Sequence, residues 1–325
     1  MAQRPRRKKR KSKSPILLLL LLLVVIAVLG YKYLPESQQL AEKISGDRTG
    51  TVSQLKPETQ SAVSVSVGRL NSSQAILVRL KDQKILMAKN SEEKIYPASM
   101  TKIMTAILAI ENLPDLQEKI QLPPAIFQGL YQANASMTGF QPEEQVSAMD
   151  LLYGVMLPSG AESCVGLAER IAGSEGKFAL LMNQKAAELG MNHTHFENAT
   201  GLHAENHYTT VKDLAVLLSY ALQNDLFREV FTASRYSTPP TNKHPGGITF
   251  YSTMFSALSS PKIAGGEILG GKTGYTDEAG LCLASLAQVG KEQYILITAG
   301  AKGNHDSEQY NISDALAVYN SLGKE

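Results

Sequence analysis

The stretch YPASMTKIMTA, residues 96–106, combines a break in the chain with the start of a helical pattern. Pro97 interrupts the preceding segment, and apolar residues then recur at positions 103, 106, 107 and 110. This spacing is typical of one face of a helix, so we expect a helix from Ser99 to Glu111. Because Ser99 and Lys102 are three residues apart, their side chains would lie on the same face.

A serine and a lysine on one helix face are candidates for nucleophilic chemistry. A serine hydroxyl is a weak nucleophile and needs a neighbouring base. Lys102 could act as that base if burial and a second cation lower its pKa. The N-terminus of the helix would also present backbone N–H groups to a developing oxyanion. The Ser-x-x-Lys spacing is common by chance, so the pair alone predicts acyl transfer only weakly.

Two other segments supply residues that fit the same chemistry. Lys272-Thr273-Gly274 joins a cation to a hydroxyl, which suits a carboxylate ligand, and the cation is a candidate neighbour for Lys102. The preceding Gly270-Gly271 would let a ligand backbone approach the strand closely. Ser159, within LPSGA at residues 157–161, is a candidate proton relay. It is also a candidate helix N-cap, and the two roles are compatible.

The remaining periodicity predicts strands near both ends of the chain and helices between them. Strands are expected at 75–80, 84–88, 267–271, 280–288 and 293–300, and helices at 148–157, 161–172, 177–189, 211–222 and about 306–322. Gly290 in a tight turn favours antiparallel pairing of the last two strands, and Thr210 with Asp213 is a capping pair. These patterns predict an α/β fold of the α+β kind. Its antiparallel sheet is built from N- and C-terminal segments, flanked by helices, with an inserted helical subdomain.

The N-terminal region is basic and then apolar. Eight of the 32 Lys and Arg residues lie between positions 4 and 13, directly before an apolar run at 16–29. A basic flank of this kind orients the terminus towards the cytoplasm. The run would span about 21 Å as a helix, which fits a cleaved signal peptide as well as a membrane anchor. Because the excess of positive over negative charge is confined to one terminus, the net charge of +2 does not indicate nucleic-acid binding.

We therefore divide the chain into four segments. Residues 1–14 form a basic cytoplasmic tail, 15–34 a transmembrane anchor or signal peptide, 35–62 a polar linker, and 63–325 an exported catalytic domain. The expected location is the cell membrane, with a single span and the catalytic domain outside the cytoplasm, or secretion if the N-terminal segment is cleaved.

Metal and disulfide chemistry have little support in the sequence. Cys164 and Cys282, the only two cysteines, lie in apolar patterns typical of buried reduced thiols, although a disulfide between them stays possible in an exported protein. His203 and His207 are four residues apart but lie in a segment typical of a loop. We expect no metal and no cofactor.

Four segments closely resemble the serine-type D-Ala-D-Ala carboxypeptidases, which are low-molecular-mass penicillin-binding proteins of the penicilloyl-serine transferase superfamily. They are residues 96–106 (YPASMTKIMTA), 151–160 (LLYGVMLPSG), 200–208 (TGLHAENHY) and 270–284 (GGKTGYTDEAGLCLA). The resemblance covers roughly residues 75–322. It implies a bacterial cell-wall enzyme whose substrate is the D-Ala-D-Ala end of a peptidoglycan stem peptide and which β-lactams inhibit covalently.

The resemblance also implies a role for each matching residue. These are Ser99 as the acylated nucleophile, Lys102 as its base, Ser159 as the proton relay, Lys272 and Thr273 as ligands of the terminal carboxylate, Gly274 in the substrate-binding strand, and the backbone N–H groups of Ser99 and Tyr275 as the oxyanion hole.

One position departs from the family pattern. The third residue of the middle motif is usually Asn, whose amide contacts the substrate, and here it is Ala161. Losing one such hydrogen bond costs ~1–3 kcal/mol, or about tenfold to a hundredfold in rate. Glu162 follows but would point elsewhere on a helix. Two alternatives therefore stay open: a β-lactamase, for which Glu197 is the nearest candidate to activate a deacylating water, or a low-activity module that binds stem peptides or penicillin.

Overall fold

The computed structural model describes residues 55–57 and 70–323. The predicted cytoplasmic tail, the predicted anchor and most of the predicted linker lie outside the described residues. Among the helices that the structure does describe, none is both long enough and apolar enough to cross a membrane.

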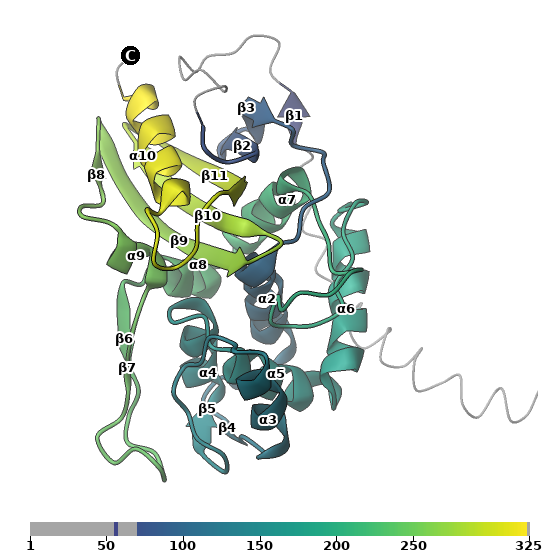
Figure 1. Cartoon of the computed structure of the whole chain (residues 1–325). Helices are drawn as coiled ribbons and strands as arrows, with labels where there is room; N and C mark the ends of the chain where they lie inside the picture. Colours follow the sequence, from purple (N-terminus) through teal and green to yellow (C-terminus); the bar gives the residue numbers. More distant parts are fainter. Residues whose placement is uncertain (1–54, 58–69, 324–325) are drawn as a thin grey trace, which may run out of the picture. The chain divides into compact units, whose positions relative to one another are not determined.

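A seven-stranded sheet organises the fold (Figure 1), in the order β1-β3-β2-β11-β10-β9-β8. Its strands are β1 (Lys56–Pro57), β2 (Gln74–Arg79), β3 (Lys84–Lys89), β8 (Lys262–Ile263), β9 (Gly266–Thr276), β10 (Gly280–Val289) and β11 (Glu292–Ala301). The described pairs are antiparallel except β1 with β3, which is parallel. The predicted sheet from both ends of the chain is therefore confirmed.

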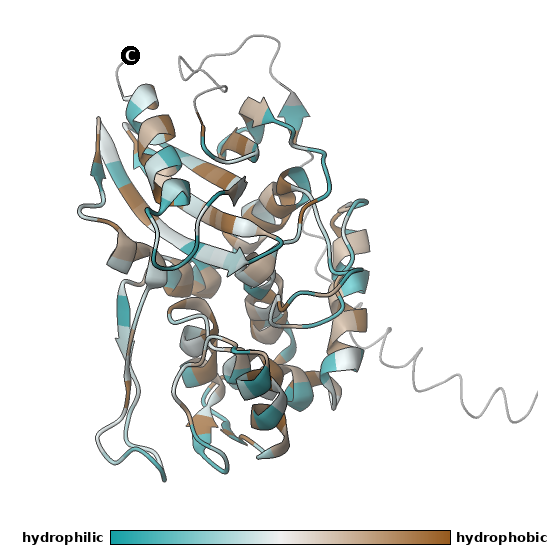
Figure 2. Cartoon of the chain, in the orientation of Figure 1, coloured by the Kyte–Doolittle hydropathy of each residue, from teal (hydrophilic) through white to brown (hydrophobic). Residues whose placement is uncertain are grey.

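The central strands are buried on both faces. In β2, Ile76 and Val78 join one hydrophobic cluster and Leu77 joins another, because successive side chains of a strand point to opposite faces. One face is covered by α7 (Val211–Ala221) and α8 (Asp225–Thr232), and the other by α10 (Tyr310–Leu322). Hydrophobic residues accordingly run along β10 and β11 in Figure 2, whereas the glycine-rich β9 is mostly pale.

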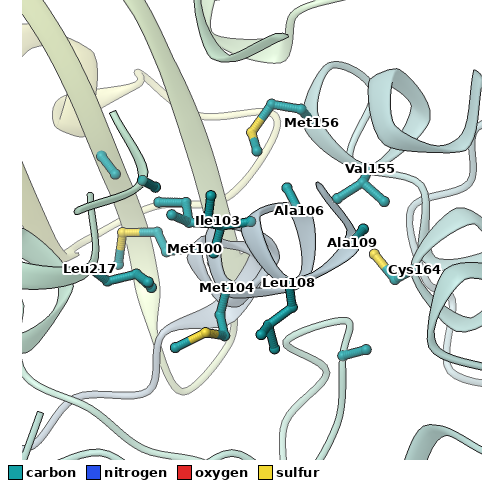
Figure 3. Packing of buried hydrophobic residues seen from close by; sticks show 14 of the residues in the cluster. Met100, Ile103, Met104, Ala106, Leu108, Ala109, Val155, Met156, Cys164 and Leu217 are labelled. Atoms are coloured by element: carbon teal, nitrogen blue, oxygen red, sulfur yellow. The ribbon is translucent and has the colours of Figure 1, made fainter. Parts of the chain in front are cut away.

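A short 3₁₀ turn, η2 (Ala98–Thr101), leads into α2 (Lys102–Asn112), which is buried over its first eight residues. A helix that is buried all round belongs to the centre of a domain. Helices α4 (Ala148–Met156), α5 (Ala161–Ala172) and α6 (Glu175–Glu188) pack around it together with α7. Figure 3 shows Met104 and Ala106 of α2 among side chains that include Met156 of α4 and Cys164 of α5.

Most predicted elements agree with the structure to within about two residues. The helix predicted from Ser99 begins one residue earlier as η2, and the Thr210 cap is confirmed, since its hydroxyl accepts the Asp213 N–H at 3.0 Å. Two boundaries were wrong. Strand β9 continues through Lys272 to Thr276 because it pairs with β10 along this length. Helix α10 begins at Tyr310 and not at 306, because Asn304 and Ser307 close a turn before it.

Several short elements had no clear sequence signal. They are β4 (Lys119–Gln121), α3 (Ala125–Gln132), β5 (Gln145–Ser147), β6 (Arg235–Ser237), β7 (Thr249–Tyr251) and α9 (Thr253–Ala257). Strands β4 and β5 form one small antiparallel sheet, and β6 and β7 form another. The predicted linker also includes β1, which pairs with β3.

Candidate active site

Ser99 lies in the second position of η2, after a strained residue. Ala98 has φ of +45°, a left-handed conformation that costs about 1–2 kcal/mol for a residue with a side chain. Gly201, with φ of +81°, packs directly on this turn: a Cβ at Gly201 would lie 1.9 Å from the Ala98 carbonyl oxygen. The conformation that presents Ser99 therefore depends on a glycine about one hundred positions further along the chain.

Lys102 places its amine against Ser99. Its Nζ lies 2.9 Å from Ser99 Oγ and donates to the carbonyl oxygen of Thr200 at 2.5 Å. The side chain is only 2% exposed, and burial lowers the pKa of Lys102. The carboxyl groups of Glu162 and Glu175 oppose this shift. A lowered pKa increases the share of neutral amine, which is the form that accepts a proton from a hydroxyl.

The loop at 197–207 supports this pair from behind. Asn198 Oδ1 accepts the Gly201 N–H at 2.7 Å, which fixes the turn that carries the Thr200 carbonyl. His207 links the loop to η2: its Nδ1 accepts the Glu197 N–H at 3.1 Å, and its Nε2 lies 2.8 Å from Thr101 Oγ1. Burial lowers the pKa of His207 to about 4, so the ring is neutral at pH 7.

These contacts assign the proton of the neutral ring to Nε2, which donates to Thr101. The ring of His203 packs edge-on against Tyr96, with the ring centroids 4.7 Å apart. The described residues contain no group of three or more His, Cys, Asp or Glu side chains placed to hold a metal.

Strand β9 brings the second serine–lysine pair to the same place. It passes beside η2 so closely that a Cβ at Gly274 would lie 3.1 Å from the Ser99 nitrogen. The fully buried Lys272 donates from Nζ to Ser159 Oγ and to the Thr273 carbonyl oxygen, both at 2.9 Å. Burial, followed by the charge of Lys102, lowers the pKa of Lys272 well below its usual range.

Two interpretations of the sequence around this pair were wrong. Ser159 does not cap α5, because Gly160 is the N-cap residue and Ser159 has φ of +68° just before it. The glycines before Lys272 face protein and not a ligand. A Cβ at Gly270 would lie 2.4 Å from the Phe231 carbonyl oxygen, and one at Gly271 the same distance from Met254 Sδ. These glycines allow α8 and α9 to pack on β9.

A cavity of about 650 Å³ opens over the two pairs. Five of the predicted site residues line it: Ser99, Ser159, Thr273, Gly274 and Tyr275. The two lysines lie behind their serines and do not line it. The hydroxyls of Thr273 and Thr253 are 2.7 Å apart, and the Tyr275 ring packs edge-on against His305 with the centroids 5.0 Å apart.

Sequence reasoning missed the other walls of the cavity. They come from the loop with Ser136 and Thr138, from β7 with Tyr251, from α9 with Thr253 and Ser256, and from the segment that carries His305. None of these residues stands in a motif, and the folding of distant segments brings them together. The Ser136 loop contacts the middle motif through the Ala161 N–H, which donates to the Ser136 carbonyl oxygen at 2.8 Å, and α9 contacts the last motif through Thr253 and Thr273.

Glu162, considered above beside Ala161, and Glu197, considered above for a β-lactamase, do not line the cavity. The buried Glu162 points away from it, as expected, and accepts the Gly139 N–H at 2.9 Å. Glu197 is exposed and does not line the cavity. Cys164 and Cys282 are free and buried, as predicted, and burial raises the pKa of each thiol to about 12.

The arrangement is suited to acyl transfer. A hydroxyl on a strained turn lies against a buried amine and faces an open cavity. A second hydroxyl, coupled to a second buried amine, faces the same space and could pass a proton to a leaving group.

Comparisons with known proteins agree with this chemistry. The profile of the D-alanyl-D-alanine carboxypeptidase family, peptidase S11, matches residues 59–303. The D-alanyl-D-alanine carboxypeptidase DacF of Bacillus subtilis (strain 168) is 35% identical over 230 residues, which is 70% of this chain and 57% of the relative. DacC of Escherichia coli (strain K12) is 32% identical over 259 residues, or 75% of this chain and 60% of the relative.

One of the solved structures has a fold similar to that of this chain. The crystal structure of the Streptomyces K15 DD-transpeptidase matches with a TM-score of 0.70 and 26% identity, and the match covers 79% of this chain and 98% of that one. The chain spans 57% and 60% of the length of the two curated relatives.

Proposed function

Because the chain belongs to the D-alanyl-D-alanine carboxypeptidase family, we propose that it is a serine hydrolase that removes the terminal D-alanine from peptidoglycan stem peptides. One observation carries the proposal: Ser99 Oγ lies 2.9 Å from the buried Lys102 amine and faces the cavity. A nucleophile and a desolvated base within hydrogen-bond distance are what an acyl-serine route needs.

In the acylation step, neutral Lys102 takes the proton of Ser99 while Oγ attacks the carbonyl carbon of the penultimate D-Ala. The N–H groups of Ser99 and Tyr275 would stabilise the oxyanion that forms. The peptide C–N bond then breaks, and Ser159, coupled to Lys272, gives a proton to the departing D-Ala amine while the proton that Lys102 took from Ser99 replaces it. Water hydrolyses the acyl ester, releases the shortened peptide and regenerates Ser99.

The same residues would act on substrate and on β-lactam inhibitor. The Thr273 hydroxyl lines the cavity with Lys272 behind it, and together they would hold the terminal carboxylate. A β-lactam would acylate Ser99 in the same way. Its leaving nitrogen stays tethered in the opened ring, so the adduct would persist. The exposed Glu197 lies outside the cavity lining, which favours this proposal over the β-lactamase alternative.

For location, we keep the proposal that residues 15–34 anchor the chain in the membrane, with the catalytic domain outside the cytoplasm. The basic residues before this segment support that orientation.

Labelled penicillin and D-Ala release from an N-acylated L-Lys-D-Ala-D-Ala peptide test the function. Wild type should form a stable adduct and release D-Ala, and Ser99→Ala should do neither. An adduct that survives Ser99→Ala would overturn the nucleophile assignment. An adduct without D-Ala release would indicate the binding module, and rapid penicillin turnover a β-lactamase.

A further inference from the structure

The segment Ser136–Gly139 forms one wall of the cavity and is fixed to the first turn of α5. Three hydrogen bonds connect them: Ala161 N–H to the Ser136 carbonyl oxygen at 2.8 Å, Thr138 Oγ1 with Ser163 Oγ at 2.7 Å, and Gly139 N–H to Glu162 Oε1 at 2.9 Å. The first turn of α5 begins two residues after Ser159, so this wall is held in a defined position relative to the proposed proton relay.

Packing strengthens the connection. A Cβ at Gly160 would lie only 1.6 Å from Thr138 Oγ1, so the Thr138 hydroxyl takes the space that a side chain would need. Glu162 is fully buried, and its Oε2 has no hydrogen-bond partner among the described residues. Burial raises the pKa of Glu162, and its one hydrogen-bonded oxygen, Oε1, accepts the Gly139 N–H.

Ser136 is the residue of this wall whose hydroxyl is available. It is exposed, it lines the cavity, and its Oγ makes no hydrogen bond within residues 70–323. The Thr138 hydroxyl, by contrast, is already paired with Ser163. Ala161, at the family's Asn position, is 1% exposed and presents only a methyl group.

We propose that Ser136 is a substrate-binding residue that makes the polar contact Ala161 cannot make. Its ligand is the amide that precedes the scissile bond, in a stem peptide or in the acylamino side chain of a penicillin. A hydroxyl both donates and accepts, so it suits either the carbonyl or the N–H of that amide. The inference rests on the proposed function, because it names the substrate group that this wall of the cavity recognises.

A double-mutant cycle on kcat/KM for an N-acylated L-Lys-D-Ala-D-Ala peptide tests the proposal. Ser136→Ala should lower kcat/KM about tenfold, since one hydrogen bond is lost. In the Ala161→Asn background the introduced amide makes the contact, so Ser136→Ala should change kcat/KM less than twofold. Ser259→Ala is the control and should leave kcat/KM unchanged, because Ser259 is also an exposed serine but does not line the cavity. Equal effects of Ser136→Ala in the two backgrounds would overturn the proposal.

The acylation rates with two β-lactams distinguish substrate binding by Ser136 from a purely structural role. Acylation by benzylpenicillin, which carries an acylamino group, should slow about tenfold in Ser136→Ala, whereas acylation by a carbapenem, which has none, should not change. Equal slowing of both would mean that Ser136 only supports the fold. If wild type reacts with neither β-lactam and releases no D-Ala, the proposed function fails, and that result differs from an unchanged Ser136→Ala variant of an active enzyme.

Discussion

The two serine–lysine pairs have the same 2.9 Å spacing but are built in different ways. Ser99 and Lys102 are three residues apart, and one turn of backbone at the start of α2 brings them together. Ser159 and Lys272 are 113 residues apart and meet only because β9 passes beside the start of α5. A local pair is visible in the sequence, whereas a non-local pair is visible only as two separate motifs.

The pairs also differ in what holds each lysine. Lys102 donates to the Thr200 carbonyl oxygen, and the carboxyl groups of Glu162 and Glu175 raise its pKa against the effect of burial. Lys272 donates to the carbonyl oxygen of its neighbour Thr273, and the charge of Lys102 adds to the effect of burial. The first pair therefore depends on the 197–207 loop, and the second depends on its own strand.

Replacing each lysine by methionine should give the largest difference between the pairs. Lys102→Met removes the proposed general base and should lower the penicillin acylation rate about 10²- to 10⁴-fold. Lys272→Met removes the proposed charge-assisted contact to the ligand carboxylate and should lower the same rate about tenfold to a hundredfold. Both rates are measured as adduct formation with labelled penicillin. Equal losses would show that the two amines act as one unit.

The same contrast explains how far the sequence could predict the site. The periodicity of 99–111 placed Ser99 and Lys102 together, and the family motifs named Ser159 and Lys272. The strain at Ala98, the close approach of Gly201 and the contact between Thr273 and Thr253 depend on chain segments that no spacing connects. For the same reason, Gly270 and Gly271 suggested a ligand when their real neighbours are α8 and α9.

Gly201→Ala tests whether the Ser99–Lys102 pair depends on the 197–207 loop. An alanine there meets the Ala98 carbonyl oxygen and also has an unfavourable φ. Gly190→Ala is the control, because Gly190 has φ of +73° but no atom within 4 Å of the added Cβ.

The control should lose about 1–2 kcal/mol of unfolding free energy through its backbone conformation alone. Gly201→Ala should lose about 1–3 kcal/mol more through overpacking and should also acylate more slowly. Chemical denaturation and adduct formation measure the two effects. Identical stability of the two variants would show that Gly201 does not support the Ser99 turn.

His207, which links the 197–207 loop to η2, should make the free energy of unfolding depend on pH. Its pKa is about 4 in the folded chain against an ordinary value of 6.5, so between these values the unfolded chain binds the extra proton. The free energy of unfolding should therefore fall as the pH falls from about 6.5 to about 4, with a total His207 contribution of about 3 kcal/mol. Below pH 4 both states are protonated and this contribution stops changing.

Denaturant unfolding at several pH values measures the dependence. His207→Gln keeps a donor for Thr101 without titrating, so its stability should change less with pH in this window. A slope equal to that of wild type would contradict the burial of a neutral His207.

The strand of the second pair is connected to α9 through Thr253, and removing this contact should have the smallest effect of the changes considered. Thr253 contacts the Thr273 hydroxyl at 2.7 Å and so helps to orient it towards the cavity. Thr253→Val removes this hydrogen bond at nearly constant volume, which costs about 1 kcal/mol, or about fivefold. Because Thr273 is proposed to hold the terminal carboxylate, the loss should appear in KM for a D-Ala-D-Ala peptide and not in kcat.

Thr249→Val, a change at another cavity threonine, should leave KM unchanged, since the Thr249 hydroxyl pairs with Ser237 and not with the site. A loss confined to kcat would place Thr253 in the proton path of Ser159 and Lys272, and the two pairs would then differ less than their construction indicates.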